Sequence, residues 1–355
     1  MEMIFVKNLK GGEILAKTIF NTSGSLLINA GTTITTKLIS LLESNNIFFV
    51  FILANDPYAV PKDKIMEDLK NKAIDHLPEI FTSILSCDQT NEDYLINIVD
   101  ELSEHIFYSP EITTTLFQVQ QFDNYTYLHC VDTGIMAMYL GTAMGYSKNQ
   151  VKDLGLAGFL HDIGKLDIPN NILNKPGRLT SSEYKIMQTH AEKTNKILNS
   201  TNIFSKEVID GASQHHEHYD GSGYPNGLSG NNISEFGRIL ALCDVFTAIS
   251  SNRCYREKFN ANEAYEFILA NRGILFDPKI VDIFKETFSI YPIGCYVRLS
   301  NELEGYVIKQ NPGFADRPIL KILYDKNKKI RLEKPYEFDL LKNINVTIQE
   351  VVMNK

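Results

Sequence analysis

The sequence predicts a mainly α-helical protein with a small strand-rich unit at each end. From residue 62 onward, apolar residues recur at helical spacing, and between 111 and 288 proline and glycine are confined to short connections. Before residue 57 and after residue 288, short apolar runs instead alternate with turn residues, which is typical of strands.

Residues 1–56 predict a small α+β N-terminal domain. Apolar runs at 13–20, 26–31 and 47–53 are separated by turn residues and indicate strands, whereas 35–46 has the pattern of a helix. The run at 47–54 is the longest apolar stretch of the chain and is too short to cross a bilayer.

Residues 57–110 predict a helical linker region in which we expect Pro78 and Pro110 to interrupt the helices. Residues 111–288 predict a larger all-helical domain. Residues 289–355 predict a strand-rich C-terminal extension, with strand-like runs such as CYVRLS and PILKILYD.

The composition indicates a globular cytoplasmic protein. The formal net charge is −8 and no basic block offsets it, so we expect no binding to a nucleic-acid polymer. The five cysteines are far apart and never form a CxxC pair, which indicates reduced thiols and neither a disulfide framework nor a zinc knuckle. The N-terminus has no charged-then-apolar leader, and we expect no membrane association.

The histidines are gathered in the helical region. The chain has eight, and six of them lie between residues 129 and 218. Five of these six, together with two acids of the same helical region, are candidate metal ligands: His129, His161, Asp162, His190, His215, His216 and Asp244.

Burial is the physical reason to expect a metal. Asp244 lies in the almost wholly apolar stretch GRILALCDVFTAIS, and an isolated buried carboxylate is costly unless it is paired or bound to a cation. Five imidazoles and two carboxylates are too many for one tetrahedral zinc. The set suits two divalent ions bridged by a carboxylate and a water, with iron or manganese as the best match.

A single core histidine is more often hydrogen-bonded than metal-bound, and His76, His105 and His218 are given that structural interpretation. It is the order of the motifs along the chain that favours a metal centre for the others.

Four motifs resemble the HD-GYP family, a branch of the HD metallohydrolases that acts on cyclic di-GMP. They are HDIGKLDIP at 161–169, NKPGRLT at 174–180, HHEHYDGSGYPNGLSG at 215–230 and GRILALCDVFTAISSNRCYR at 237–256. The resemblance covers about half of the chain. The flanking units also resemble domains often found beside HD-GYP units, and neither brings a known chemistry.

The resemblance implies a role for each matching residue. His129, His161, Asp162 and Asp244 would hold one ion, and His190, His215 and His216 would hold the other, with Asp162 as the bridge. Lys165 and Asp162 would be the catalytic residues. Substrate would be bound by Lys165, Tyr224, Arg253 and Arg256, with Gly223 and Pro225 shaping the loop.

The chain departs from the family pattern at three places. Tyr125 stands where some members have a glutamate that helps to hold a third iron, so we expect a dinuclear centre. Thr247 replaces an acid, and we expect weaker outer support of the metal site from it. The usual Arg-Pro-Tyr reads Arg253-Cys254-Tyr255, which would shift the loop carrying both arginines.

The resemblance implies a phosphodiesterase that hydrolyses cyclic di-GMP to linear pGpG, with further hydrolysis to GMP left open. Two alternatives remain: a low-activity or non-catalytic cyclic-dinucleotide sensor, and a hydrolase of another nucleotide such as (p)ppGpp or cyclic GMP-AMP. A homodimer or a signalling-protein partner is equally left open.

Overall fold

The structure is a computed structural model of the 355-residue chain. The residues it describes are 2–6, 9–20, 26–45, 47, 49–52, 64–86, 92–108, 125–175, 177–250, 261–291, 293–311, 313–325, 327 and 330–352.

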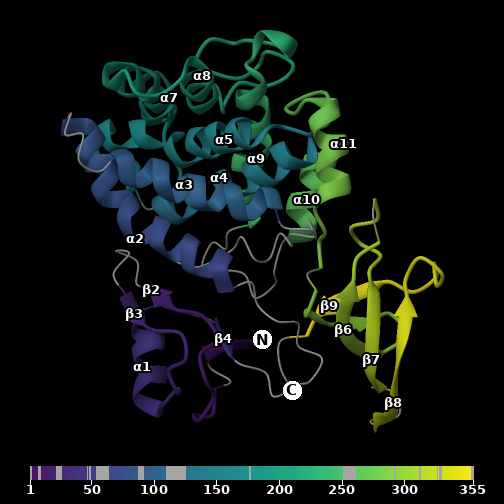
Figure 1. Cartoon of the computed structure of the whole chain (residues 1–355). Helices are drawn as coiled ribbons and strands as arrows, with labels where there is room; N and C mark the ends of the chain where they lie inside the picture. Colours follow the sequence, from purple (N-terminus) through teal and green to yellow (C-terminus); the bar gives the residue numbers. More distant parts are fainter. Residues whose placement is uncertain are drawn as a thin grey trace.

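The described part of the chain is mainly helical, with strands near both ends, as the sequence predicts (Figure 1). The helices are α1 (Thr36–Ser44), α2 (Lys64–Ser86), α3 (Glu92–Tyr108), α4 (Tyr125–Ala143), α5 (Lys148–Leu160), α6 (Asn170–Leu173), α7 (Ser181–Thr201), α8 (Lys206–Ser213), α9 (Glu235–Ser250), α10 (Ala261–Ala270) and α11 (Pro278–Thr287). Two 3₁₀ turns are η2 (Ile163–Asp167) and η3 (Gly230–Asn232). The described helices include none whose length and apolar content would let it span a bilayer.

The N-terminal unit is a small α+β structure with its own core. Strand β1 (Glu2–Phe5) pairs antiparallel with β4 (Phe49–Ile52), and β2 (Ile19–Phe20) pairs antiparallel with β3 (Leu26–Ile28). Helix α1 begins where the Thr35 hydroxyl accepts a hydrogen bond from the Leu38 amide. Buried aliphatic side chains from the strands and α1 form a cluster separate from the helical core.

Helix α2 differs from the sequence-based expectation, because Pro78 lies inside it and does not interrupt it. Proline removes one backbone hydrogen bond from a helix interior and normally kinks or ends it. Here Leu77 and Phe81, on either side of Pro78, are both fully buried in the helical core. The buried face of α2 packs against α3 and continues past the proline, which offsets the lost hydrogen bond.

Helices α4, α5 and α9 form the centre of the helical body. Residues 154–160 of α5 and 129–140 of α4 are buried without a break, which is expected of helices that are apolar on every side. Helix α5 begins with a capping box between Ser147 and Gln150, and α7 begins with one between Thr180 and Glu183. These caps fix the first residue of each helix, and the helix length then fixes the position of the residues at its end.

The C-terminal unit is a five-stranded antiparallel sheet with strand order β8-β7-β6-β5-β9. Its strands are β5 (Tyr296–Leu299), β6 (Leu303–Lys309), β7 (Ile319–Asp325), β8 (Ile330–Asp339) and β9 (Ile348–Val351). Figure 1 shows the sheet beside α10 and α11. The Ile290 amide donates to the Ala315 carbonyl at 3.2 Å, and Gln310 donates to the Tyr291 carbonyl at 2.5 Å, which joins the sheet to the end of the helical body.

The crossing of α4 and α5 depends on glycine. A Cβ at Gly158 would lie 2.5 Å from the Gly134 Cα, so the two backbones approach too closely for any side chain. A Cβ at Gly155 would instead meet the flexible end of Met138, with Sδ at 2.7 Å. Space for a methyl group at Gly155 can therefore be made by a rotamer change, whereas at Gly158 it requires a backbone shift.

We expect Gly158→Ala to lower the melting temperature by about 5 °C or more, because overpacked cores typically lose stability of this order. Gly155→Ala on the same helix is the matched control and should change the melting temperature much less. Thermal unfolding followed by circular dichroism measures both. Equal effects of the two variants would show that backbone contact does not set the helix crossing.

Candidate metal centre

The structure brings all seven candidate ligands into one buried region. They come from the following elements: His129 from α4, His161 from the end of α5, Asp162 from the turn before η2, His190 from α7, His215 and His216 from the segment after α8, and Asp244 from α9. Six of the seven are buried, and His216 is partly exposed. Residues separated by more than a hundred positions thus line one site.

The first cluster is formed by His129, His161 and Asp162, whose ligand atoms all lie within 4.8 Å of one another. His129 Nε2 is 2.7 Å from Asp244 Oδ1, and His161 Nε2 is 3.3 Å from Asp162 Oδ2. Asp244 Oδ1 is also 3.7 Å from His161 Nε2. Two imidazoles and two carboxylates therefore face a common point.

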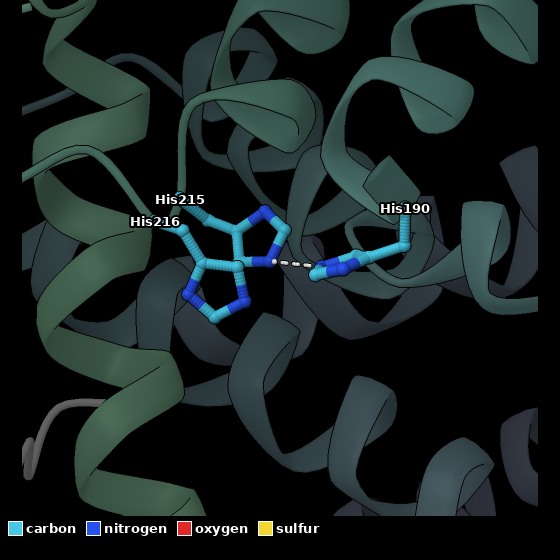
Figure 2. A group of neighbouring side chains, drawn as sticks. All are labelled: His190, His215 and His216. Carbon is cyan, nitrogen blue, oxygen red and sulfur yellow. Dashed lines mark hydrogen bonds between the residues drawn. The ribbon is translucent and has the colours of Figure 1, made fainter. Parts of the chain in front are cut away.

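The second cluster is formed by His190, His215 and His216. Figure 2 shows the paired rings of His215 and His216 facing His190 across the site, and the Nε2 atoms of His190 and His215 are 3.3 Å apart. Asp162 Oδ1 lies 3.4 Å from His190 Nε2 and 3.9 Å from His215 Nε2. Asp162 consequently faces the first cluster with Oδ2 and the second with Oδ1.

Backbone carbonyls orient three of the imidazoles. Nδ1 of His161, His190 and His215 lies 2.7, 2.8 and 2.7 Å from the carbonyl oxygen three residues earlier in each case. A carbonyl can only accept, so each Nδ1 carries the hydrogen and, in a neutral ring, Nε2 presents its lone pair to the site. Metal-binding histidines are oriented in this way by the hydrogen bond of their other nitrogen.

Burial keeps the histidines of the second cluster neutral. It lowers the pKa of His190 and lowers that of His215 well below the ordinary value. Burial likewise lowers the pKa of His216 to about 3. A neutral imidazole is the form that binds a metal ion.

The donor set fits a metal centre. His161 Nε2 and Asp162 Oδ1 are buried and have no hydrogen-bond partner among the described residues. The Nε2 lone pairs of His190 and His215 face each other at 3.3 Å, which is unfavourable without a cation between or beside them. Although burial opposes it, the Asp162 and Asp244 carboxylates raise the pKa of His161 to about 10, which shows how strongly this point attracts positive charge.

Lys165 lies at the edge of the site. Its Nζ is 2.5 Å from Asp162 Oδ2, and about a quarter of its side chain is exposed. Burial acts against its charge, but the Asp162 carboxylate raises the pKa of Lys165 above its ordinary value. The lysine therefore stays cationic beside the candidate metal ligands.

Thr194 is a supporting residue that the sequence did not single out. Its hydroxyl donates to the His161 carbonyl at 3.0 Å and accepts from the Gly164 amide at 3.1 Å. A Cβ at Gly164 would lie 2.1 Å from the His190 carbonyl oxygen, so α7 rests directly on η2. The only sequence signal for this role is that Thr194 lies one helical turn after His190.

The loop after the histidine pair lies against the second cluster. The Tyr224 ring is 4.7 Å from the His216 ring at an angle of 30°, and the Tyr224 amide donates to the His216 carbonyl at 3.0 Å. Pro225 follows through a cis peptide bond. A Cβ at Gly223 would lie 2.3 Å from the His218 amide nitrogen, so this glycine allows close approach to the protein's own backbone.

The other residues considered in the sequence either lie outside the clusters or fall outside the described part of the chain. His76, His105 and His218 lie outside both candidate clusters. His76 makes an edge-to-face contact with Tyr94, and His218 Nδ1 is 2.8 Å from the Ser222 hydroxyl. The expectations for Arg253, Cys254, Tyr255 and Arg256, and for the side chain of Tyr125, fall outside the described residues.

Thr247 forms part of the support of His129. Its hydroxyl is 2.8 Å from the Cys243 carbonyl, to which it donates, so its oxygen is an acceptor for other groups. Thr133 Oγ1 lies 2.8 Å from it and His129 Nδ1 lies 3.2 Å from it. A hydrogen bond from His129 Nδ1 to Thr247 leaves Nε2 facing Asp244, the orientation that a metal ligand requires.

We expect Thr247→Val to weaken metal binding about 10- to 100-fold, the usual effect of losing the outer partner of a ligating histidine. Thr247→Ser keeps the hydroxyl and is the matched control. Competition with a chelator, titrated on the full chain, measures the affinity directly. Valine and serine variants of equal affinity would show that Thr247 only fills space.

Two parts of the chain match models of known protein families. Residues 110–280 match the model of the HD domain, and residues 296–355 match the model of a KOW domain associated with the HD domain. The HD match covers the helices from α4 to the start of α11, and the KOW match covers the strand-rich unit that follows them.

Several similar proteins have names that state an activity. A cyclic di-GMP phosphodiesterase of Pseudomonas aeruginosa is 36% identical over 66% of this chain and 56% of its own length. A cyclic di-GMP phosphodiesterase of Thermotoga maritima is 32% identical over 64% of this chain and 63% of its own. A 3'3'-cGAMP-specific phosphodiesterase of Vibrio cholerae is 40% identical over 40% of this chain and 27% of its own.

The chain thus spans between 27% and 63% of the length of these three relatives. Among solved structures, an HDG"Y"P protein from Bdellovibrio bacteriovorus has a TM-score of 0.50 at 16% identity, over 80% of this chain and 99% of that one, which shows a shared fold. These comparisons confirm the similarity to cyclic di-GMP phosphodiesterases with an HD domain that the motifs indicate.

Proposed function

We propose that this protein is a metal-dependent phosphodiesterase that hydrolyses cyclic di-GMP to linear pGpG, with GMP as a further product. The observation that carries the proposal is the position of Asp162, whose two carboxylate oxygens face two separate histidine clusters. The names of the Pseudomonas and Thermotoga relatives support the choice of substrate.

We propose that His129, His161, Asp162 and Asp244 hold one divalent ion. His190, His215 and His216 would hold a second, with Asp162 shared between them. Bound divalent ions would polarise a phosphate oxygen and lower the pKa of a water that attacks the phosphorus. The mixture of imidazole and carboxylate donors suits iron or manganese.

The protein's own side chains would bind and orient the substrate. Lys165, cationic and partly exposed, lies where it can neutralise charge on a phosphate that enters beside Asp162. Tyr224 offers an aromatic ring next to His216 and suits contact with a nucleobase, with Gly223 and Pro225 shaping its loop. We propose that Arg253 and Arg256 add positive charge on the substrate side.

A second substrate is favoured by one finding. The Vibrio relative named for 3'3'-cGAMP is 40% identical over the aligned part, so cyclic GMP-AMP is the alternative substrate to test. The sensor alternative relied on weak support from Thr247, and the contact of Thr247 with His129 argues against that weakness.

We further propose the division of the chain into an N-terminal domain at 1–56, a helical linker region at 57–110, a catalytic domain at 111–288 and a C-terminal extension at 289–355. A cytoplasmic location is supported by the free, buried thiols of Cys130, Cys243 and Cys295.

The function is tested by purifying the full chain without oxygen, measuring its metal content, and separating the products of cyclic di-GMP and cyclic GMP-AMP by chromatography. We expect pGpG from cyclic di-GMP, abolished by a chelator and restored by iron or manganese. Metal-loaded protein that leaves both cyclic dinucleotides intact would refute the proposal.

The shared position of Asp162 leads to a prediction about metal content. We expect Asp162→Ala to lose both metal ions and His129→Ala to lose mainly one, because Asp162 lies against His161 of the first cluster and against His190 and His215 of the second, whereas His129 belongs to the first cluster. Elemental analysis of the purified proteins gives the occupancy. Asp162→Asn keeps the shape of the side chain and shows whether misfolding explains a loss.

His218→Ala is the matched control for these variants. His218 belongs to the same motif as His215 and His216 but lies outside the clusters, so its loss should leave the metal content unchanged. Full occupancy in Asp162→Ala would contradict a shared carboxylate.

A further inference from the structure

Glu217 directly follows the histidine pair and belongs to neither candidate ligand cluster. It is 1% exposed, which is unusual for a carboxylate. From the sequence HHE, a third metal ligand would be the obvious interpretation. Neither of the two candidate ligand clusters among the described residues contains Glu217.

Both carboxylate oxygens of Glu217 instead accept backbone hydrogen bonds from the loop that carries Tyr224. Oε1 accepts from the Asn226 amide at 2.7 Å, and Oε2 accepts from the Leu228 amide at 2.9 Å. Hydrogen bonds to an ionised acceptor are stronger than those between neutral groups. One buried side chain therefore holds the loop at two points just beyond the Tyr224-Pro225 pair.

The same loop is attached at its other end as well. The Tyr219 amide donates to the Leu275 carbonyl at 3.0 Å, and the Asp220 amide donates to the Ile274 carbonyl at 2.9 Å. Between these attachments, the Tyr224 amide binds the His216 carbonyl. The loop is thus closed around Tyr224, and Glu217 supplies the side-chain contacts on its C-terminal side.

We propose that Glu217 is a positioning residue that holds the Tyr224 loop in place, so that the aromatic ring is already seated beside His216 when a nucleotide enters. This inference rests on the proposed function for the part that concerns substrate. Its structural part, that the carboxylate of Glu217 binds the loop and no metal ion, stands on the two amide contacts alone.

The variant Glu217→Gln tests whether the side chain holds the loop or binds a metal ion. The amide group keeps one acceptor oxygen, but its NH₂ end would face the second backbone N–H, so one of the two contacts must be lost. Asp220→Asn is the matched control: it removes one negative charge from the same loop, yet its remaining oxygen can still accept from the Ser222 amide, which lies 2.9 Å from Asp220 Oδ1.

Amide hydrogen exchange on the full chain measures the loop directly. In Glu217→Gln we expect peptides that contain Asn226 and Leu228 to exchange about ten-fold faster or more, with α8, α9 and the metal content unchanged. Asp220→Asn should leave these peptides close to the unmodified protein. Unchanged exchange in Glu217→Gln would overturn the role in the loop, and loss of metal would make Glu217 a ligand.

Steady-state kinetics with cyclic di-GMP test the part of the inference that concerns substrate. We expect Glu217→Gln to raise KM by about ten-fold while kcat falls less, because the loop binds substrate and does not carry the reaction. Faster exchange with an unchanged KM would overturn the role toward substrate. If the unmodified protein does not act on cyclic dinucleotides, the proposed function fails, and the exchange experiment still decides the structural part.

A folding defect in Glu217→Gln would show as faster exchange throughout the helical body. In that event Glu217→Asp, which keeps the charge but is one methylene shorter, replaces it. It should free the same two amides without lowering the net negative charge, and protection of both amides in this variant would overturn the inference.

Discussion

The buried carboxylate of Asp162 is the constraint on which the rest of the site depends. It is 1% exposed, so its charge must be balanced by nearby groups. Lys165 and His161 approach one oxygen, and His190 and His215 approach the other. Burial raises the pKa of Asp162, but Lys165, His161 and His190 together outweigh it and hold that pKa well below the ordinary value. The end of α5, helix α7 and the segment after α8 must therefore all converge on one side chain.

Hydrogen bonds within the protein, and not a metal ion alone, hold the candidate ligands close together. The imidazoles are oriented by carbonyl groups of their own helices, three residues earlier in the chain. Thr194 joins α7 to the turn that contains Asp162, and Thr247 binds His129 from α9. Such contacts hold the ligands before a metal ion arrives, which lowers the cost of ordering them on binding.

The sequence predicted which seven side chains lie together, but it did not predict the contacts that hold them. The metal-ligand candidates could be predicted because buried histidines and acids on successive apolar helices share few explanations other than a metal. The supporting roles of Thr194, Glu217 and Thr247 could not be predicted. The hydrogen-bond partner of a hydroxyl or carboxylate depends on which distant segments of the chain pack together. The prediction at Pro78 was wrong for a similar reason. Local rules predict that a proline ends the helix, but burial of Leu77 and Phe81 on either side of it stabilises a continuous helix.

His216 connects the two halves of the site. It belongs to the second candidate cluster, its ring stacks on Tyr224, and its carbonyl accepts the Tyr224 amide. Gly223 also packs directly against the backbone of 216–218, so His216 and the loop of Tyr224 are joined by backbone contact as well as by their rings. Glu217 is the next residue, and its carboxylate binds the far side of the loop through the Asn226 and Leu228 amides. The candidate metal ligands and the proposed nucleotide-binding loop therefore share one short stretch of backbone, 215–218.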